Sequence, residues 1–143
     1  MPNELFLVDT SVWIFALRKN PVPQIRNRID LLLREDVVLT TGIIKLEILA
    51  GVKTDKEYRR LKSRFDALES LETDDDLWQN ACEHAFKLRR SGLTAPSTDI
   101  LIATCALQAG AILLHADAHF DLMERVLKVR TESLVQALKK ALT

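Results

Sequence analysis

The sequence lacks an excess of charge of either sign and any long apolar run. Lysine plus arginine and aspartate plus glutamate each number 20 among the 143 residues, so the formal net charge is zero. A balanced charge gives no global attraction to nucleic acid or to a membrane surface, although it leaves room for a local basic patch. The longest apolar stretch, 100–114, is interrupted by Gln108 and Gly110. It falls short of the ~20 residues that a membrane-spanning helix needs.

Cysteine is also scarce, and its spacing excludes a cysteine-based metal site. Cys82 and Cys105 form no C-x-x-C and no Cys/His pattern of the kind that binds zinc. Both lie among apolar residues of predicted helices, so we expect both to be buried as small hydrophobic side chains. The first residues include Glu4 and Asp9 but no basic segment, which predicts no signal peptide and a cytoplasmic protein.

The residues that are present predict one globular α/β domain spanning 1–143. Hydrophobic residues make up 48% and charged residues 28%, which is ordinary for a folded domain of this length. Apolar runs typical of buried strands alternate with helical patterns, which indicates a mostly parallel central sheet flanked by helices. We expect strands at 5–8, 37–40, 71–72, 111–114 and 128–130, and helices at 11–17, 24–34, 42–50, 54–69, 77–91, 98–108, 117–126 and 133–142.

Two aspartates directly follow predicted strands. Asp9 comes after the run "LFLV", and Asp117 comes two residues after the strand 111–114. In parallel α/β sheets, ligands bind at the carboxyl ends of the strands, so both aspartates lie where such a fold keeps its site. Each could instead cap the helix that follows, since aspartate is a favoured N-cap.

Two further carboxylates lie on predicted helices. Glu47 shares a face with Ile43, Leu46 and Ala50 in "GIIKLEILAG", where an apolar residue is expected, so a buried Glu47 needs a cation, a hydrogen-bond network, an arginine partner or an open pocket. Alternatively, Glu47 is simply exposed at the edge of the helix. Asp99 opens the helix "TDILIATCALQAG" and aligns with small residues on an inward face. Ser97, Thr98 and Asp99 could each cap that helix, which leaves at least one of them spare.

These four carboxylates can converge, because strand carboxyl ends and the following helix N-termini meet at one edge of a parallel sheet. Four converging carboxylates cannot all stay ionised without compensation. The natural partner is a hard divalent cation, Mg²⁺ or Mn²⁺. Such an ion activates water and binds phosphate oxygens, which indicates phosphodiester cleavage.

At these residues the chain resembles the PIN-domain family, and within it the VapC-type toxins of bacterial toxin–antitoxin pairs. The resemblance lies in "LFLVDTSVWI", "KLEILAG" and "STDILIATCALQAGAILLHADAHFD", in that order along the chain. It implies a Mg²⁺-dependent endoribonuclease, with Mn²⁺ as a substitute, that cleaves structured RNA such as transfer or ribosomal RNA. It also implies a homodimer and a VapB-type antitoxin partner.

The resemblance assigns residue roles as well. Asp9, Glu47, Asp99 and Asp117 match the four acids of the family as catalytic and metal-binding residues. Ser11 matches a supporting hydroxyl, and Asp121 is a fifth acid near the site. His115 stands where many relatives carry threonine or serine; it could contact the scissile phosphate or the water bound to the metal, or it could be a structural histidine.

Two basic groups are candidates for RNA binding. One comprises Arg59, Arg60, Lys62 and Arg64, and the other comprises Lys87, Arg89 and Arg90. Each could instead be a solvated helix face, and binding through them would fall with salt. The aromatic side chains in apolar runs are expected in the core or in a dimer interface; they are Trp13, Phe15, Phe86 and Phe120.

Other functions remain open on the sequence. An aspartyl-nucleophile phosphatase also begins with an aspartate at a strand end, but it wants a second aspartate where this chain has Ser11. A non-catalytic receiver-like Mg²⁺-binding module expects a paired acid and a lysine at a late strand end, and "ILLHADAHF" has no lysine. A PIN domain that serves only as a binding scaffold is disfavoured because all four acids are present.

Overall fold

A five-stranded sheet forms the centre of the computed structural model, which describes residues 4–143. The strand order is β3-β2-β1-β4-β5, and every neighbouring pair is parallel, so the prediction of a mostly parallel sheet is confirmed. The strands are β1 (Phe6–Val8), β2 (Val38–Thr41), β3 (Glu69–Leu71), β4 (Ile112–His115) and β5 (Thr131–Ser133).

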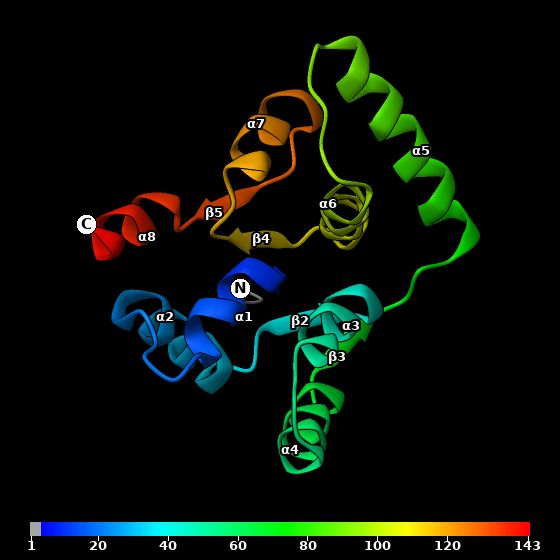
Figure 1. Ribbon diagram of the computed structural model, residues 1–143. Coiled ribbons are helices and arrows are strands. Elements are labelled where there is room, and N and C mark those ends of the chain that lie inside the picture. Colours follow the sequence, from blue (N-terminus) through cyan, green and yellow to red (C-terminus); the bar gives the residue numbers. More distant parts are fainter. Residues whose placement is uncertain (1–3) are drawn as a thin grey trace.

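Helices cover both faces of this sheet (Figure 1). They are α1 (Thr10–Leu17), α2 (Pro23–Arg34), α3 (Gly42–Ala50), α4 (Asp55–Asp66), α5 (Asp75–Arg90), α6 (Ser97–Ala109), α7 (Ala118–Leu127) and α8 (Val135–Leu142). The helices α1 to α4 lie on one side, and α5 to α7 lie on the other. None of the helices within residues 4–143 is both long and apolar enough to cross a membrane.

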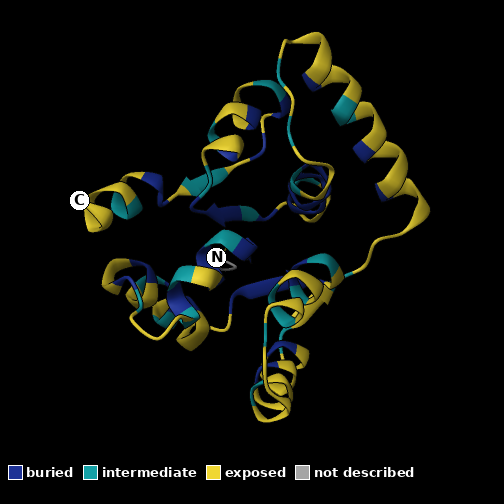
Figure 2. Ribbon diagram, in the orientation of Figure 1, coloured by how far each residue is buried: buried dark blue, intermediate teal, exposed yellow. Residues whose placement is uncertain are grey.

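The middle of the sheet is the core of the molecule. Leu7 pairs in register with Leu39 on one side and with Leu113 on the other, and all three side chains are almost fully buried. Because both sheet faces are covered, the central strands are continuous apolar runs rather than alternating ones. Burial is concentrated there and in α6, while the outer surfaces of α4 and α5 are exposed (Figure 2).

The order of the strands determines where in the sheet the candidate site lies. The chain runs from β1 through β2 to β3 on one side of β1, and then returns to β4 on the other side. Such a change of direction between neighbouring strands opens a crevice at their carboxyl ends. Asp9 follows β1 and Asp117 follows β4, so the two aspartates flank this crevice.

Three predicted segments differ clearly from the structure. The predicted strand at 128–130 is wrong: Lys128 adopts a left-handed conformation (φ 60°) that ends α7, and sheet pairing with β4 begins only at Thr131. The helix predicted over 54–69 ends at Asp66, because 69–71 pair with β2 as a strand. The short strand predicted at 71–72 therefore lies two residues earlier.

The expected burial of both cysteines is half right. Cys105 is buried in α6, but Cys82 is exposed on the outer face of α5. Helix α5 packs its Leu77, Ala81 and Leu88 inward, which turns Cys82 toward solvent. Phe86 is exposed for the same reason, at 64%, so it is not a core residue, whereas Trp13 and Phe120 are buried.

Candidate metal centre

Asp9 is a buried carboxylate held by short-range hydrogen bonds. Its backbone N–H donates to the Leu114 carbonyl at 2.9 Å, which continues the pairing of β1 with β4. The side chain caps α1: Oδ2 accepts from the Ser11 N–H at 3.0 Å and from the Ser11 hydroxyl at 2.6 Å. Asp9 is only 3% exposed, and its Oδ1 has no hydrogen-bond partner among the described residues. One oxygen of the Asp9 carboxylate therefore caps α1, while the other has no hydrogen-bond partner among the described residues.

Ser11 connects the two strand ends. Its Oγ donates to Asp9 and accepts from the Ala116 N–H at 3.0 Å, so it fixes the start of α1 against the segment that follows β4. Burial raises the pKa of Asp9, and the hydrogen bonds from Ser11 partly offset that effect.

Glu47 reaches the site from the rim rather than from a buried face. Thr10 donates its hydroxyl hydrogen to Glu47 Oε1 at 2.8 Å, which ties α3 to the first turn of α1. Glu47 is exposed, and Leu46 beside it is 64% exposed, while Ile44 is the fully buried residue of α3. The expectation that Glu47 lies on an inward face with Leu46 is thus wrong. Helix α3 is apolar nearly all round, so its pattern does not define which face is packed.

Asp99 occupies the third position of α6. The N-cap residue is Pro96, which forms no side-chain hydrogen bond, so none of the three predicted capping residues, Ser97, Thr98 and Asp99, is at the N-cap. Ile102, Ala103 and Ala106 are buried, as expected for its inward face. Burial first, and then the charges of Asp9 and Asp117, raises the pKa of Asp99 to about 6. A carboxyl group that is half protonated near pH 6 marks a place where negative charge is crowded.

Asp117 caps α7 and brings a histidine to Asp99. Asp117 Oδ1 accepts from the His119 N–H at 2.9 Å. The ring Nδ1 of His119 then lies 3.2 Å from Asp117 Oδ1 and 3.5 Å from Asp99 Oδ2. Ligand atoms of Asp99, Asp117 and His119 all fall within 4.8 Å of one another.

His119 was missed by the sequence reasoning, as was Thr10. His119 could have been predicted from its position two residues after Asp117, because the backbone N–H at that position usually donates to the capping carboxylate. Thr10 carried no comparable signal, because its partner Glu47 comes from a different helix.

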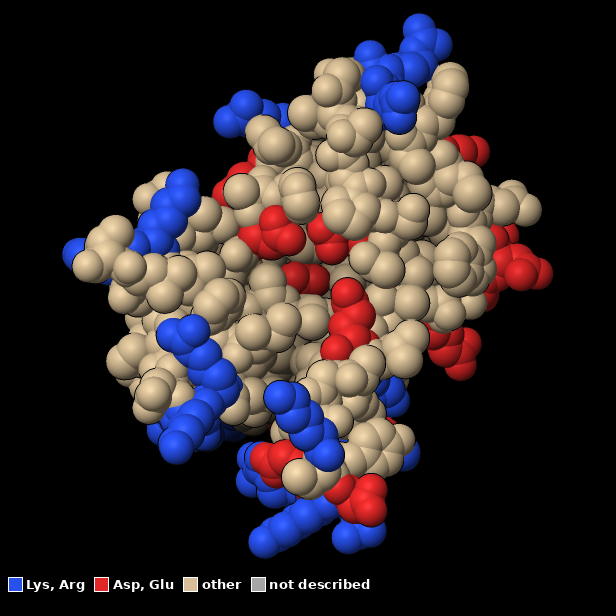
Figure 3. Space-filling model, in the orientation of Figure 1, with Lys and Arg blue, Asp and Glu red and all other residues tan. Residues whose placement is uncertain are grey.

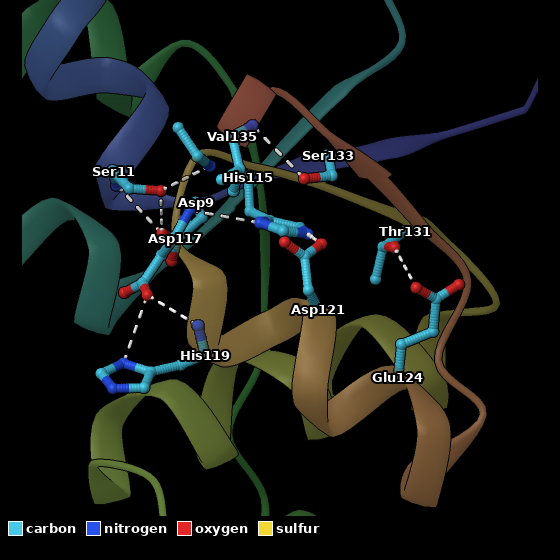
Figure 4. A network of polar contacts seen from close by, with 11 residues as sticks. Asp9, Ser11, His115, Asp117, His119, Asp121, Glu124, Thr131, Ser133 and Val135 are labelled. Carbon is cyan, nitrogen blue, oxygen red and sulfur yellow. Dashed lines mark hydrogen bonds and ion pairs between the residues drawn. The ribbon is translucent and has the colours of Figure 1, made fainter. Parts of the chain in front are cut away.

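His115 lies beneath the site instead of facing it. The side chain is fully buried, and its ring packs 5.1 Å from that of Phe120. Nδ1 accepts from the Asp117 N–H at 3.3 Å, and Nε2 lies 3.5 Å from Asp121 Oδ1 (Figure 4). Burial lowers the pKa of His115, which favours the neutral ring. This placement favours the structural role over contact with a phosphate.

The space-filling view gathers these features on one face. Acidic side chains meet in a hollow at its centre, and basic side chains lie toward its edges, over the far end of α5 and over α4 (Figure 3). On α4, Arg60 is held by Glu57 and Lys62 by Asp66. Within residues 4–143, Lys87, Arg89 and Arg90 at the end of α5 form no ion pair. Arg90 stacks on Phe86 at 5.7 Å.

A parallel α/β domain with carboxylates at the ends of its central strands is typical of metal-binding α/β proteins. Comparison with known proteins identifies the family. Residues 6–126 match the PIN domain family. The sequence is 31% identical to VapC ribonuclease Mb1587 of Mycobacterium bovis, over 90% of this chain and 98% of that protein. It is 28% identical to ribonuclease VapC18 of Mycobacterium tuberculosis, over 92% and 96%. The chain therefore belongs to the PIN-domain family, and within it to the VapC group.

A solved structure agrees on the fold. A chain from the Rickettsia felis VapBC2 complex bound to a promoter DNA fragment superposes with a TM-score of 0.75 and 20% identity, covering 90% of this chain and 98% of that one.

Proposed function

We propose that this chain is a metal-dependent endoribonuclease and the toxin of a type II toxin–antitoxin pair. The observation that carries the proposal is the approach of Asp99 and Asp117 from separate segments, with the charge of Asp9 also raising the pKa of Asp99 and one buried Asp9 oxygen left without a donor. The names of the VapC relatives add the substrate class, because both relatives described above are called ribonucleases.

The donor set fits a divalent cation. Asp99 and Asp117 offer carboxylate oxygens close together, and Asp9 Oδ1 offers a further oxygen that nothing in the described chain satisfies. Carboxylate oxygens are the ligands that Mg²⁺ and Mn²⁺ prefer. When bound, such an ion supplies an activated water and stabilises the charge that develops on the phosphate.

The chain's own residues have distinct tasks in this proposal. Ser11 keeps Asp9 ionisable and oriented, and Thr10 holds Glu47 at the rim of the site. The task that we assign to Glu47 is to accept a proton from a water molecule at the rim of the site. Asp121, through its proximity to His115, supports the first turn of α7.

The substrate we propose is structured RNA, such as transfer or ribosomal RNA. The acidic hollow repels phosphates on its own, so basic side chains must hold the RNA on either side of the cut. Lys87, Arg89 and Arg90 are the best candidates, because they are exposed and not engaged in ion pairs within residues 4–143. Arg59 is a further candidate on α4, while Arg60 is already engaged with Glu57.

The partners we propose are a second copy of the chain and a VapB-type antitoxin. The chain of similar fold from Rickettsia felis belongs to a VapBC complex, which supports the antitoxin. A basic side chain of the antitoxin would be stabilised in the acidic hollow, because no lysine or arginine within residues 4–143 pairs with Asp99 or Asp117.

The test is RNA cleavage by Asp99→Asn. We expect this variant to fold and to lose at least about 99% of Mn²⁺-supported cleavage, equivalent to roughly 2.7 kcal/mol of transition-state stabilisation. Glu124→Gln is the matched control, because Glu124 is an exposed acid of α7 that bonds Thr131 instead of the site. Undiminished cleavage by Asp99→Asn, with contaminating nuclease excluded by a mock purification, would overturn the proposal.

A further inference from the structure

His119 places one nitrogen donor among the carboxylates. Its Nδ1 lies 3.2 Å from Asp117 Oδ1 and 3.5 Å from Asp99 Oδ2. Two ligands that sit side by side on one ion, each about 2.1 Å from it, are separated by roughly 3 Å. The spacing around His119 is therefore that of neighbouring ligands on a single cation.

The ring is oriented by the same aspartate. The His119 backbone N–H donates to Asp117 Oδ1, which places its side chain over the carboxylate that caps α7 (Figure 4). The side chain is 48% exposed and, within residues 4–143, its ring forms ion-pair contacts with these two carboxylates and with no other group. Nothing in the described chain packs it into another role.

The other two histidines of the chain cannot replace it. His115 is fully buried, with Nδ1 accepting from the Asp117 N–H. His84 belongs to α5, where its Nδ1 bonds to the Thr104 hydroxyl at 2.9 Å. Any histidine nitrogen found on an ion in this site must therefore come from His119.

A second observation points independently to a bound cation. Asp9 is 3% exposed, and its Oδ1 has no donor within the described residues. An ionised carboxylate oxygen that is buried without a donor is costly, unless a cation occupies the space before it. The charge of Asp9 contributes to the raised pKa of Asp99, so the Asp9 carboxylate lies near one of the two carboxylates that contact His119.

We infer that His119 is a ligand of the metal ion through Nδ1, and that it makes the site prefer Mn²⁺, or another transition ion, over Mg²⁺. Mg²⁺ binds oxygen and holds its water tightly, whereas imidazole nitrogen is a good ligand for first-row transition ions. A site of oxygens alone would not discriminate in this way. The inference rests on the proposed metal site and refines it, since it reverses the expected order of Mg²⁺ and Mn²⁺.

The test is binding, independent of cleavage. Calorimetric titration of the full chain with MnCl₂ and with MgCl₂ should give a clear preference for Mn²⁺. In His119→Gln the ratio of the two affinities should fall on the order of tenfold, the scale on which the loss of even an outer partner weakens a metal site. His84→Gln is the control and should keep the wild-type ratio.

Pulsed electron paramagnetic resonance of the Mn²⁺-loaded wild-type chain gives a direct readout that needs no variant. We expect a nitrogen coupling to the manganese that is present in wild type and His84→Gln and lost in His119→Gln. Mn²⁺ bound without nitrogen coupling in wild type would overturn the role of His119 while leaving the proposed metal site intact. A wild-type chain that binds neither ion would overturn both.

Discussion

Asp99 is the residue at which the crowding of negative charge has the clearest consequence for stability. Its pKa of about 6 lies above the ordinary value of 3.8, because the folded chain surrounds it with burial and with the carboxylates of Asp9 and Asp117. The folded state therefore holds the proton of Asp99 more tightly than the unfolded state does. The contribution of Asp99 to the free energy of unfolding therefore falls as pH rises from 3.8 to about 6, and it is lowest above that range.

We predict that, in EDTA, the Asp99 carboxyl makes the wild-type chain about 1 kcal/mol less stable at pH 7.5 than at pH 5. Urea unfolding at the two pH values measures the change. In Asp99→Asn that contribution should vanish, since the amide does not titrate. Added Mn²⁺ should reverse the trend in wild type, because the ion binds the deprotonated carboxylate. An equal pH dependence in wild type and Asp99→Asn would contradict the prediction.

Single residues also mark what the sequence could and could not reveal. Asp9, Asp99 and Asp117 were predictable as neighbours because each follows a strand or opens a helix, and a parallel sheet brings those ends to one edge. The hydrogen bond from Thr10 to Glu47 could not be predicted from the sequence, because it depends on how α1 and α3 pack. His119 was within reach of local reasoning, yet its approach to Asp99 depends on the positions of α6 and α7 in space.

At the scale of elements, the predicted ends of helices and strands were wrong where pairing within the sheet overrides the local sequence pattern. The residues 128–130 look like a strand, but Val129 is buried in the irregular segment between α7 and β5, and the edge strand begins only at Thr131. The helix 42–50 was predicted at its observed bounds, because Thr41 caps it and Gly51 ends it. The side of this helix that packs inward was not predicted correctly, because a helix that is apolar nearly all round has no polar side to mark its exposed face.

The end of α5 carries a separate prediction about RNA binding. We predict that changing Lys87, Arg89 and Arg90 together to glutamine weakens binding of single-stranded RNA. The logarithmic salt dependence should become shallower by about 0.7 for each phosphate that no longer has a cation beside it. Binding is measured in the Asp99→Asn background, so that the RNA stays intact, at several salt concentrations.

Arg60→Gln provides the comparison for α4. Its guanidinium is bound by Glu57 through hydrogen bonds of 2.9 and 2.5 Å, so we expect a smaller loss of affinity. If Arg60→Gln weakened RNA binding as much as the triple change at the end of α5, the assignment of the RNA-binding surface to that helix would be wrong.

At the scale of the whole molecule, the outer face of α5 carries large exposed apolar side chains. Trp78, Cys82 and Phe86 follow one another at four-residue spacing and form an exposed stripe, with Trp78 at 50% and Phe86 at 64% exposure. Such a stripe on a straight helix can pair with its own copy across a two-fold axis.

We predict that Phe86→Glu converts the proposed dimer into a monomer, because a charge introduced into a paired apolar stripe is buried without a partner. Light scattering after size-exclusion chromatography measures the mass. Leu142→Glu, which changes an equally exposed leucine at the end of α8, should leave the dimer unchanged. A dimer that survives Phe86→Glu would place the interface elsewhere.

The position of β1 at the middle of the sheet has a consequence for the timing of synthesis. Leu7 pairs with Leu113, more than a hundred residues further along the chain, so the two aspartates beside these strands meet only after β4 has joined the sheet. Chains emerge from the ribosome at about 5–20 residues per second and fold from the N-terminal side. The carboxylates at the ends of β1 and β4 therefore cannot come together until at least Asp117 has emerged, however early the N-terminal elements fold.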